Sequence, residues 1–343
     1  MKKLAFRLAC LFAACTCLCA LPACTPKAPQ IAFFVYDGTD TYISELMGKI
    51  TESIPPGYTV EIYDAGNSQA VQNQQILEAI ERRFNMLVVN AVDRLACSSI
   101  VEKCAGENLP VIFFNREPLE DAMIGGNVYY VGAAADSLGE KQADMVAALF
   151  GPDFADSPYD KNADGVVQLV ILKGEQGHQD AEKRTANCVS RLKALGFAVE
   201  VLAIEPANWA RREGQDAMEG LYARFGDMIE LVFANNDDMA LGAIDYMLEI
   251  GAFHESETGP YEQPFVIVGV DGTAVGREAI AKGLLYGTVL NDSSRQADAI
   301  TTLADYLLTQ RDLADYPYAV TRGHYIFIDG DIILRENLAN YTN

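Results

Sequence analysis

Positive charge is scarce in this sequence of 343 residues, which has 26 lysines and arginines against 48 aspartates and glutamates. The formal net charge of −22 opposes binding to a phosphate backbone and is typical of a solvated, soluble surface. Histidine is also rare, because the chain has only 3 and they lack the spacing of zinc ligands. The composition therefore argues against nucleic-acid recognition and against a histidine-based zinc centre.

Cysteine is almost absent outside the N-terminus. The chain has 8 cysteines, and beyond residue 24 only Cys97, Cys104 and Cys188 remain. Cys97 and Cys104 are separated by seven positions on a predicted helix, roughly 10 Å along its axis, which is too far for a disulfide. We expect all three to be small, buried hydrophobic side chains.

The N-terminus has the features of an export signal. Three basic residues precede a short apolar run that ends at about Ala23. The run is too short for a membrane span, which needs roughly 20 apolar residues. It ends in Leu21-Pro-Ala-Cys24, the pattern of a bacterial lipobox, which predicts a signal peptide over residues 1–23, a lipid on Cys24 and a tether over residues 24–30. The alternatives are an uncleaved anchor or an ordinary signal with an incidental cysteine.

Apolar runs of strand length alternate with amphipathic stretches of helix length almost to the end of the chain. The predicted strands are 31–36, 59–63, 86–90, 111–115, 129–132, 166–172, 198–204, 231–235, 265–270 and 287–290. The predicted helices between them include 44–53, 72–83, 138–150, 180–195 and 296–308. This alternation indicates an α/β fold with parallel sheets covered by helices on both faces. The pattern runs twice, before and after about Asp136, which predicts two similar lobes.

Residues 168–184 form the most informative stretch. A predicted strand ends in a glycine-punctuated loop, and the helix that follows opens near His178 and carries Asp180. Arg184 lies one turn later on the same face of this helix. Ligands bind outside the carboxyl ends of strands in open α/β sheets, so the carboxylate and the guanidinium would both point at a ligand. The pair suits a solute with many hydroxyl groups better than a phosphate, because Asp180 would repel an anion.

Further polar residues follow other predicted strands. Asp40 and Tyr42 follow the first strand and Asn115 ends the fourth, while three more stand at the ends of later strands: Asn236, Asp271 and Asn291. Each of them taken alone could be a turn former or a helix cap. Together they are expected to converge on one crevice between the lobes. Carboxylates, amides and one guanidinium match sugar hydroxyls, which both donate and accept hydrogen bonds.

Trp209 is the only tryptophan and lies where a helix begins after a strand. One interpretation is an aromatic residue that packs in the core. The other is that Trp209 and Tyr42, one from each lobe, hold the apolar faces of a pyranose ring between them. The polar residues around them favour the second interpretation.

Five motifs together resemble the D-galactose/D-glucose-binding proteins of bacterial ABC importers, within the periplasmic-binding-protein family. They are GEQGHQDAEKR at 174–184, FFNREP at 113–118, ANND at 234–237, GVD at 269–271 and GTVLND at 287–292. The similarity runs from about Ile31 to the C-terminus.

The resemblance implies the type I periplasmic-binding-protein fold, with two doubly wound lobes joined by a three-segment hinge. The N-terminal lobe would comprise residues 31–135 and 292–321, and the C-terminal lobe residues 136–291 and 322–343. The implied hydrogen-bonding residues are Asp40, Asn115, His178, Asp180, Arg184, Asn236, Asp271 and Asn291, and the implied stacking residues are Tyr42 and Trp209.

Two local features depart from the family pattern. The first loop, residues 36–42, is two residues longer than usual, and Tyr42 replaces the usual phenylalanine. The resemblance implies that Asp40 contacts the hydroxyl group that distinguishes glucose from galactose, so this loop bears on the preference between the two sugars. The hydroxyl group of Tyr42 needs a partner or a water molecule.

Residues 160–168 match the first half of a calcium loop. Asp160, Asn162 and Asp164 fall at loop positions one, three and five, Val166 offers a carbonyl at seven, and Gln168 stands at nine. Position twelve is Ile171 instead of glutamate, so a complete EF-hand is not formed. The resemblance implies that Glu230 supplies the missing carboxylate to a structural calcium ion. The alternative is a polar surface turn that binds nothing.

These features predict a lipid-tethered, extracytoplasmic, monomeric binding protein that passes glucose or galactose to an ABC permease or presents it to a chemoreceptor. A glycosidase would require a protonated carboxyl group beside a second carboxylate. Asp180, near a helix N-terminus and Arg184, is expected to stay ionised instead, which argues against an enzyme. A sugar-responsive transcription regulator is disfavoured by the exported N-terminus.

Overall fold

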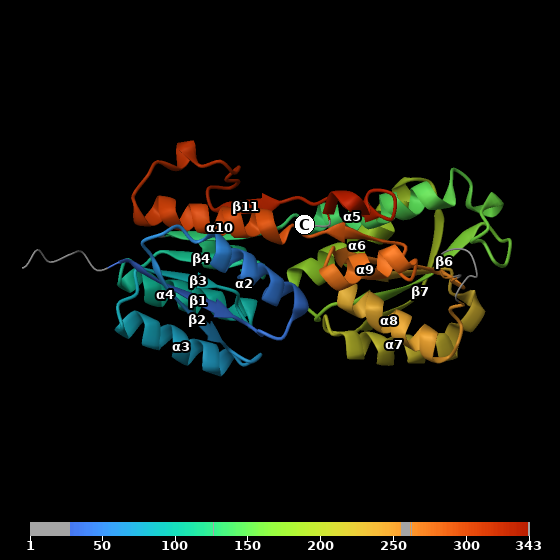
Figure 1. Ribbon diagram of the computed structural model, residues 1–343, viewed down its shortest axis with the longest axis horizontal. Helices are drawn as coiled ribbons and strands as arrows, with labels where there is room; N and C mark the ends of the chain where they lie inside the picture. The colour runs from blue at the N-terminus through green and yellow to red at the C-terminus, as the bar shows by residue number, and fades with distance from the viewer. Residues whose placement is uncertain (1–27, 126, 255–260, 262, 342–343) are drawn as a thin grey trace, which may run out of the picture.

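The computed structural model describes residues 28–125, 127–254, 261 and 263–341, which form two α/β lobes lying side by side (Figure 1). The predicted signal peptide, the lipidation site Cys24 and the first part of the tether lie outside the described residues. The predicted fold class is confirmed, because each lobe is built around a six-stranded sheet, and all pairings are parallel except that of β10 with β12 in the second lobe.

The first lobe has a fully parallel sheet with the strand order β11-β5-β4-β3-β1-β2. Its strands are β1 (Gln30–Val35), β2 (Thr59–Asp64), β3 (Met86–Val89), β4 (Val111–Phe114), β5 (Val128–Ala133) and β11 (Tyr325–Ile328). Its α-helices are α2 (Thr41–Ser53), α3 (Gln69–Glu81), α4 (Cys97–Gly106) and α10 (Ser293–Leu308). Alternate residues of β1 face opposite cores, so Phe33 packs with α2 and α10 whereas Phe34 packs with α3 and α4.

The second lobe repeats this design with the strand order β12-β10-β9-β8-β6-β7. Its strands are β6 (Val166–Lys173), β7 (Ala198–Pro206), β8 (Leu231–Ala234), β9 (Val266–Asp271), β10 (Gly287–Leu290) and the antiparallel edge strand β12 (Ile332–Leu334). Its α-helices are α5 (Ala135–Phe150), α6 (Gln179–Ala194), α7 (Arg211–Phe225), α8 (Asp237–Glu249) and α9 (Ala274–Lys282). Leu169 and Ile171 pack under α5 and α6, while Val170 and Leu172 pack under α7 and α8.

Short 3-10 helices occupy several connections. They are η1 (Arg94–Ala96), η2 (Glu120–Met123), η3 (Phe154–Asp156), η4 (Gly226–Met228), η5 (Leu313–Asp315) and η6 (Leu338–Tyr341). Cys97, Cys104 and Cys188 are buried and form no disulfide, as predicted. Within the part of the chain that the structure describes, none of the helices combines the length and the apolar character needed to cross a bilayer.

The boundary predicted at residue 322 is wrong. β11 pairs with β5 of the first lobe, so the chain returns to the second lobe only after Ile328 and not at residue 322. The sequence Tyr325–Leu334 consists of two short apolar runs around Asp-Gly-Asp and looks like a hairpin. The two strands instead join different sheets, because β12 pairs with β10.

The chain therefore passes between the lobes three times: after β5, after β10 and after β11. The third crossing segment is tied to the start of α5, since Asp329 accepts hydrogen bonds from Ser137 Oγ (2.8 Å) and Lys141 Nζ (2.6 Å). It also lies against the second crossing segment, because a methyl group on Gly330 would overlap the carbonyl oxygen of Leu290. These contacts fix how the crossing segments lie beside the cleft.

Candidate ligand-binding site

A cavity with an empty volume of about 340 Å³ lies between the lobes. The first lobe contributes residues that follow β1 and β4, and the second lobe contributes residues at or just after the ends of β6, β7, β8, β9 and β10. The lining residues are Tyr36, Asp40, Tyr42, Ile43, Asn115, Arg116, His178, Asp180, Arg184, Trp209, Asn236, Asp271 and Asn291. All ten residues that the sequence predicted for ligand binding are in this set, so the structure brings the whole predicted group together.

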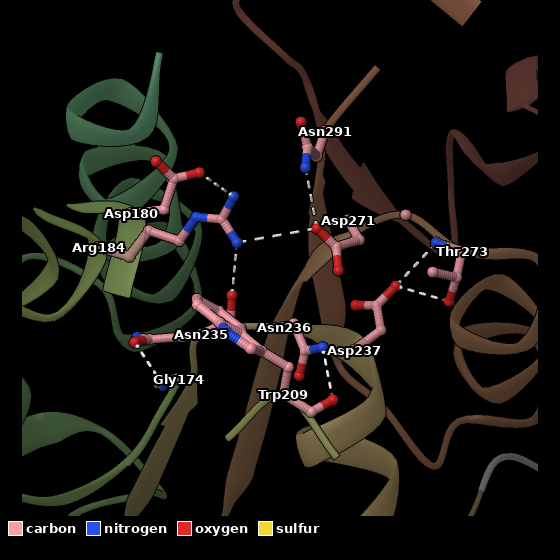
Figure 2. Close-up of polar contacts among 12 residues, drawn as sticks. Gly174, Asp180, Arg184, Trp209, Asn235, Asn236, Asp237, Asp271, Thr273 and Asn291 are labelled. Atoms are coloured by element: carbon pink, nitrogen blue, oxygen red, sulfur yellow. Dashed lines mark hydrogen bonds and ion pairs between the residues drawn. The ribbon is translucent and has the colours of Figure 1, made fainter. Parts of the chain in front are cut away.

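Arg184 is the central cation of the second lobe and is 3 % exposed. Figure 2 shows its guanidinium group pointing between Asp180, Asp271 and the backbone of Asn235. Nη2 lies 3.2 Å from Asp180 Oδ2, and Nη1 lies 3.8 Å from Asp271 Oδ1 and donates to the Asn235 carbonyl at 2.8 Å. A buried charge is tolerated only when it is paired and hydrogen-bonded. Nε is buried and has no hydrogen-bond partner among the described residues.

Burial sets the protonation of the two carboxyl groups beside Arg184. It raises the pKa of Asp180 to about 6, against the opposing effect of Arg184. It also raises the pKa of Asp271 well above its usual value, again opposed by Arg184. The expectation that Asp180 stays ionised thus needs a correction, because burial outweighs the arginine: the group is mostly ionised at pH 7 but is protonated below about pH 6.

His178 caps the N-terminus of α6 and is neutral. Its Nδ1 accepts a hydrogen bond from the Asp180 backbone N–H at 3.1 Å, so the ring proton resides on Nε2. Burial, followed by the charges of Arg116 and Arg184, keeps the pKa of His178 well below its usual value. The site therefore presents His178 as a hydrogen-bond donor without a positive charge.

Trp209 is held over the loop that follows β6. A methyl group on Gly174 would overlap the indole ring, so glycine at this position makes room for the tryptophan. The backbone of Trp209 has φ +69°, and the amide group of Asn236 donates to its carbonyl at 3.0 Å. The ring meets His178 edge-on, with centroids 5.0 Å apart. These contacts fix the orientation of the indole before any ligand arrives.

Asp40 and Tyr42 come from the start of α2 in the first lobe. Asp40 caps this helix, because Oδ1 accepts from the Ile43 N–H at 2.8 Å. Its Oδ2 accepts from the hydroxyl group of Tyr36 at 2.6 Å. The Tyr42 hydroxyl is buried without a hydrogen-bond partner among the described residues. Its orphaned hydroxyl fits the expectation that this group needs a partner.

Backbone conformation is unusual at three of the lining residues. Asn115 has φ +60°, Trp209 φ +69° and Asp271 φ +117°, all in a region that non-glycine residues rarely adopt. Such conformations persist only where the surrounding structure holds them, and they concentrate at functional sites. Asn115 is held by Asn90, whose amide donates to its Oδ1 at 3.1 Å, and Asp271 by Asn291, whose amide donates to its Oδ1 at 3.1 Å.

The sequence analysis missed three lining residues: Tyr36, Ile43 and Arg116. Tyr36 ends the first predicted strand, and Arg116 follows Asn115 directly, so both occupy strand ends like the residues that were identified. A search of each strand end for aromatic and basic neighbours would have included them. Ile43 offers no signal, because an apolar residue in the first turn of a helix is ordinary.

The predicted calcium loop places oxygen donors around one turn. Glu230, only 1 % exposed, accepts from the backbone N–H groups of Lys161 (2.8 Å) and Gln168 (2.9 Å), which brings it to the loop. Gln168 Oε1 is buried without a hydrogen-bond partner among the described residues, and an orphaned oxygen of this kind fits a hard cation. However, no group of three or more His, Cys, Asp or Glu side chains is arranged to hold a metal ion within the described residues.

Comparison with known proteins identifies the family. The model of the periplasmic binding protein domain matches residues 31–312. The D-galactose/methyl-galactoside binding periplasmic protein of Haemophilus influenzae is 32 % identical over 315 residues, which cover 88 % of this chain and 90 % of the relative. This chain belongs to the periplasmic binding protein family. The assignment agrees with the prediction of a binding protein instead of an enzyme.

Other matches of this periplasmic binding protein are more distant. The ribose import binding protein of Escherichia coli is 27 % identical, with 80 % of this chain and 83 % of the relative covered. Among solved structures, a Bacillus halodurans ABC transporter solute binding protein with bound myo-inositol superposes with a TM-score of 0.76 at 24 % identity, covering 92 % of this chain and 97 % of that chain. At 24 % identity this similarity is evidence about the fold alone, and it confirms the predicted fold.

The buried carboxyl group of Asp237, behind the site, predicts a pH-dependent stability. Asp237 accepts hydrogen bonds from Thr273 (Figure 2) and from Thr288, yet burial raises its pKa to about 7. The folded protein holds this proton more tightly than the unfolded chain, so the associated stability is complete below about pH 4 and is lost as pH rises through about 7. Asparagine mimics the neutral acid, so Asp237→Asn should reduce the decrease in melting temperature between pH 5 and 8. Calorimetric melting at several pH values checks this, and the same change of melting temperature with pH in the variant and the wild type would contradict the assignment.

Proposed function

We propose that this protein binds D-glucose or D-galactose between its lobes and delivers the sugar to an ABC permease. The observation that carries the proposal is the lining of the cavity: aromatic rings from both lobes, among them Tyr42 and Trp209, together with carboxylates, amides and guanidinium groups. A pyranose has apolar faces for such rings and a rim of hydroxyl groups for the polar side chains. The orphaned Tyr42 hydroxyl and Arg184 Nε are two groups that a sugar hydroxyl would satisfy.

The charges of the site favour a neutral ligand. Arg184 is already shared by Asp180 and Asp271. The other lining cation, Arg116, is paired with Glu175, so an anionic group would find no unpaired cation among these residues. The name of the Haemophilus influenzae relative supports a hexose of the galactose type. The Escherichia coli relative is named for ribose, and two solved structures with the same fold hold D-allose and myo-inositol. The fold alone therefore does not select a hexose, and we assign this selectivity to the side chains that line the cavity.

The mechanism that follows is closure of two lobes around the sugar. Tyr42 and Asp40 contact it from the first lobe, and Trp209, Asp180 and Arg184 contact it from the second, so the closed state gains interactions that the open state lacks. The permease then recognises the closed shape. A chemoreceptor is the alternative partner for the same closed state. A hydroxyl missing from an analogue leaves a buried polar group unpaired, which provides selectivity.

Calorimetric titration with glucose, galactose, ribose and arabinose tests the proposed function. We expect binding of at least one hexose, and we expect Trp209→Ala and Asp180→Ala each to weaken it at least about tenfold, or about 1.4 kcal/mol. Asp216→Ala, which changes an exposed ion pair on α7, is the control and should bind like the wild type. Binding of pentoses but neither hexose would overturn the substrate assignment, and near-normal affinity of either site variant would refute the location of the pocket.

We further propose that a calcium ion stabilises the loop at residues 160–168. The ligands would be side-chain oxygens of Asp160, Asn162, Asp164, Gln168 and Glu230 and the carbonyl oxygen of Val166. The donor set consists entirely of oxygen, which suits calcium, and the orphaned Gln168 Oε1 supports the assignment. The ion would brace the second lobe away from the sugar.

Thermal melting with calcium and with a chelator tests this site. An ion that binds only the folded state raises the melting temperature, so calcium should stabilise the wild type. Asp160→Ala removes the first ligand. The variant should melt at the same temperature with calcium and with the chelator, and its hexose affinity should stay close to that of the wild type. Equal calcium responses of the variant and the wild type would eliminate the site.

The lipobox supports a lipid on Cys24 that anchors the protein to the outer face of a bacterial membrane. The residues involved lie outside the described part of the chain, and the proposal rests on the sequence alone. Cys24→Ala should shift the protein from the membrane fraction to the soluble extracytoplasmic fraction of cells that express it. Membrane association that survives the substitution would favour an uncleaved N-terminal anchor instead.

A further inference from the structure

Arg116 is a buried cation at the boundary of the sugar cavity. Its side chain is 5 % exposed although it follows β4 at the surface of the cleft. The guanidinium carbon lies 3.8 Å from the centre of the Tyr36 ring, and Nη1 donates to the carbonyl of Val92 at 2.7 Å. A cation stacked on an aromatic ring away from water is held in one orientation. These two contacts hold the guanidinium group against the first lobe, while its Nε and Nη2 form no hydrogen bond with the described residues.

The opposite lobe supplies the counter-charge of Arg116. Glu175 stands in the loop after β6, and its Oε2 lies 2.7 Å from Arg116 Nη2. Three other polar contacts join the lobes nearby: Arg94 with Gln179, Lys183 with Glu117, and Thr41 with Asp238. Of the residues in these four contacts, Arg116 alone lines the sugar cavity. The ion pair of Arg116 and Glu175 is thus the closing contact that lies against the ligand.

A second cavity lies on the other side of Arg116. It has an empty volume of about 800 Å³ and is lined by both lobes, including Leu95, Leu119 and Glu175. Arg116 and His178 are the lining residues that the two cavities share. These two side chains therefore lie at the boundary between the two cavities.

Tyr36 connects Arg116 to the carboxylate of Asp40. The guanidinium group of Arg116 stacks on the ring of Tyr36, and the Tyr36 hydroxyl donates to Asp40 Oδ2 at 2.6 Å. Burial, and then the charge of Asp40, keep the pKa of Tyr36 above its usual value, so the hydroxyl stays protonated as a donor. Together with the Ile43 N–H on Oδ1, this bond sets which lone pairs of Asp40 remain for a sugar hydroxyl.

We propose that Arg116 is a latch residue whose ion pair with Glu175 holds the lobes closed over the hexose, and that Tyr36 beneath it is a positioning residue for Asp40. The inference rests on the proposed function, because it assigns closure and sugar preference at the same site. Tyr36 and Arg116 thereby determine specificity alongside the residues that face the sugar hydroxyls.

Closure through this latch acts mainly on sugar dissociation. The ion pair forms only when the lobes meet, so an encounter with the open protein does not depend on it. Loss of one partner leaves a buried charge unpaired, which in protein interfaces raises the dissociation rate more than it changes the association rate. Glu175→Gln should therefore open the cleft faster without altering any residue that lines the sugar cavity.

Stopped-flow fluorescence of Trp209, the single tryptophan, measures the association and dissociation rates of glucose and galactose. We expect Glu175→Gln to raise the hexose dissociation rate about fivefold or more, with an association rate within about twofold of the wild type. The effects of Arg116→Gln and Glu175→Gln on the dissociation rate should be non-additive in the double variant, because both substitutions break the same ion pair. The matched control is Asp245→Asn, which breaks the Arg211–Asp245 ion pair within the second lobe and should leave both rates unchanged.

Tyr36→Phe tests the positioning role separately. Phenylalanine keeps the ring beneath Arg116 but removes the donor to Asp40, so the ratio of glucose to galactose affinity should change by about threefold or more. If Tyr36 had a purely structural role, the substitution would lower the affinities for both sugars by the same factor and leave their ratio unchanged. Circular dichroism melting of each variant verifies that the fold is retained.

The outcomes separate the inference from the proposed function. A wild type that binds a hexose, with variants of Glu175 and Tyr36 that match it in dissociation rate and in sugar ratio, overturns the inference alone. A wild type that binds neither hexose overturns the proposed function, and the inference falls with it. Additive effects of Arg116→Gln and Glu175→Gln would also contradict the latch, because they would show that the two residues act independently.

Discussion

The buried guanidinium group of Arg184 is the constraint on which the site depends. A charge this deep needs partners on several sides, and the second lobe supplies them from separate elements: Asp180 on α6, the Asn235 backbone after β8 and Asp271 at the end of β9. Only the carboxyl ends of neighbouring parallel strands bring such groups together. The strand order therefore brings the partners of Arg184 together (Figure 2), and Asp180, Arg184 and Asp271 line the ligand cavity there.

The two lobes contribute different chemistry to the cleft. The second lobe provides the charged cluster and the indole of Trp209, which Gly174 and Asn236 hold in place. The first lobe provides Tyr42 and the fixed carboxylate of Asp40. Neither lobe alone forms the cavity, because its lining residues come from both. Three crossing segments join the lobes, and the second and third of them lie against each other at Leu290 and Gly330.

Local pattern was enough to predict most of the fold and all ten residues of the candidate ligand set. Buried parallel strands such as β8 are apolar along their whole length, and polar residues at their ends stand out against them. The route of the last strands could not be predicted, since the pairing of Tyr325–Ile328 with β5 depends on contacts far away in the sequence. The raised pKa of Asp180 was missed because spacing places Arg184 beside it but does not give the depth of burial. Arg116 was missed because its partner Glu175 lies in the other lobe.

Growth of crystals in excess galactose or glucose tests the central claim of a neutral hexose held between two lobes. The account predicts an intact pyranose with Tyr42 and Trp209 against its faces, its hydroxyl groups bonded to Asp180 and Arg184, and the cleft closed. Density for the sugar at any other place, or a cleft that stays empty at saturating sugar, would contradict it.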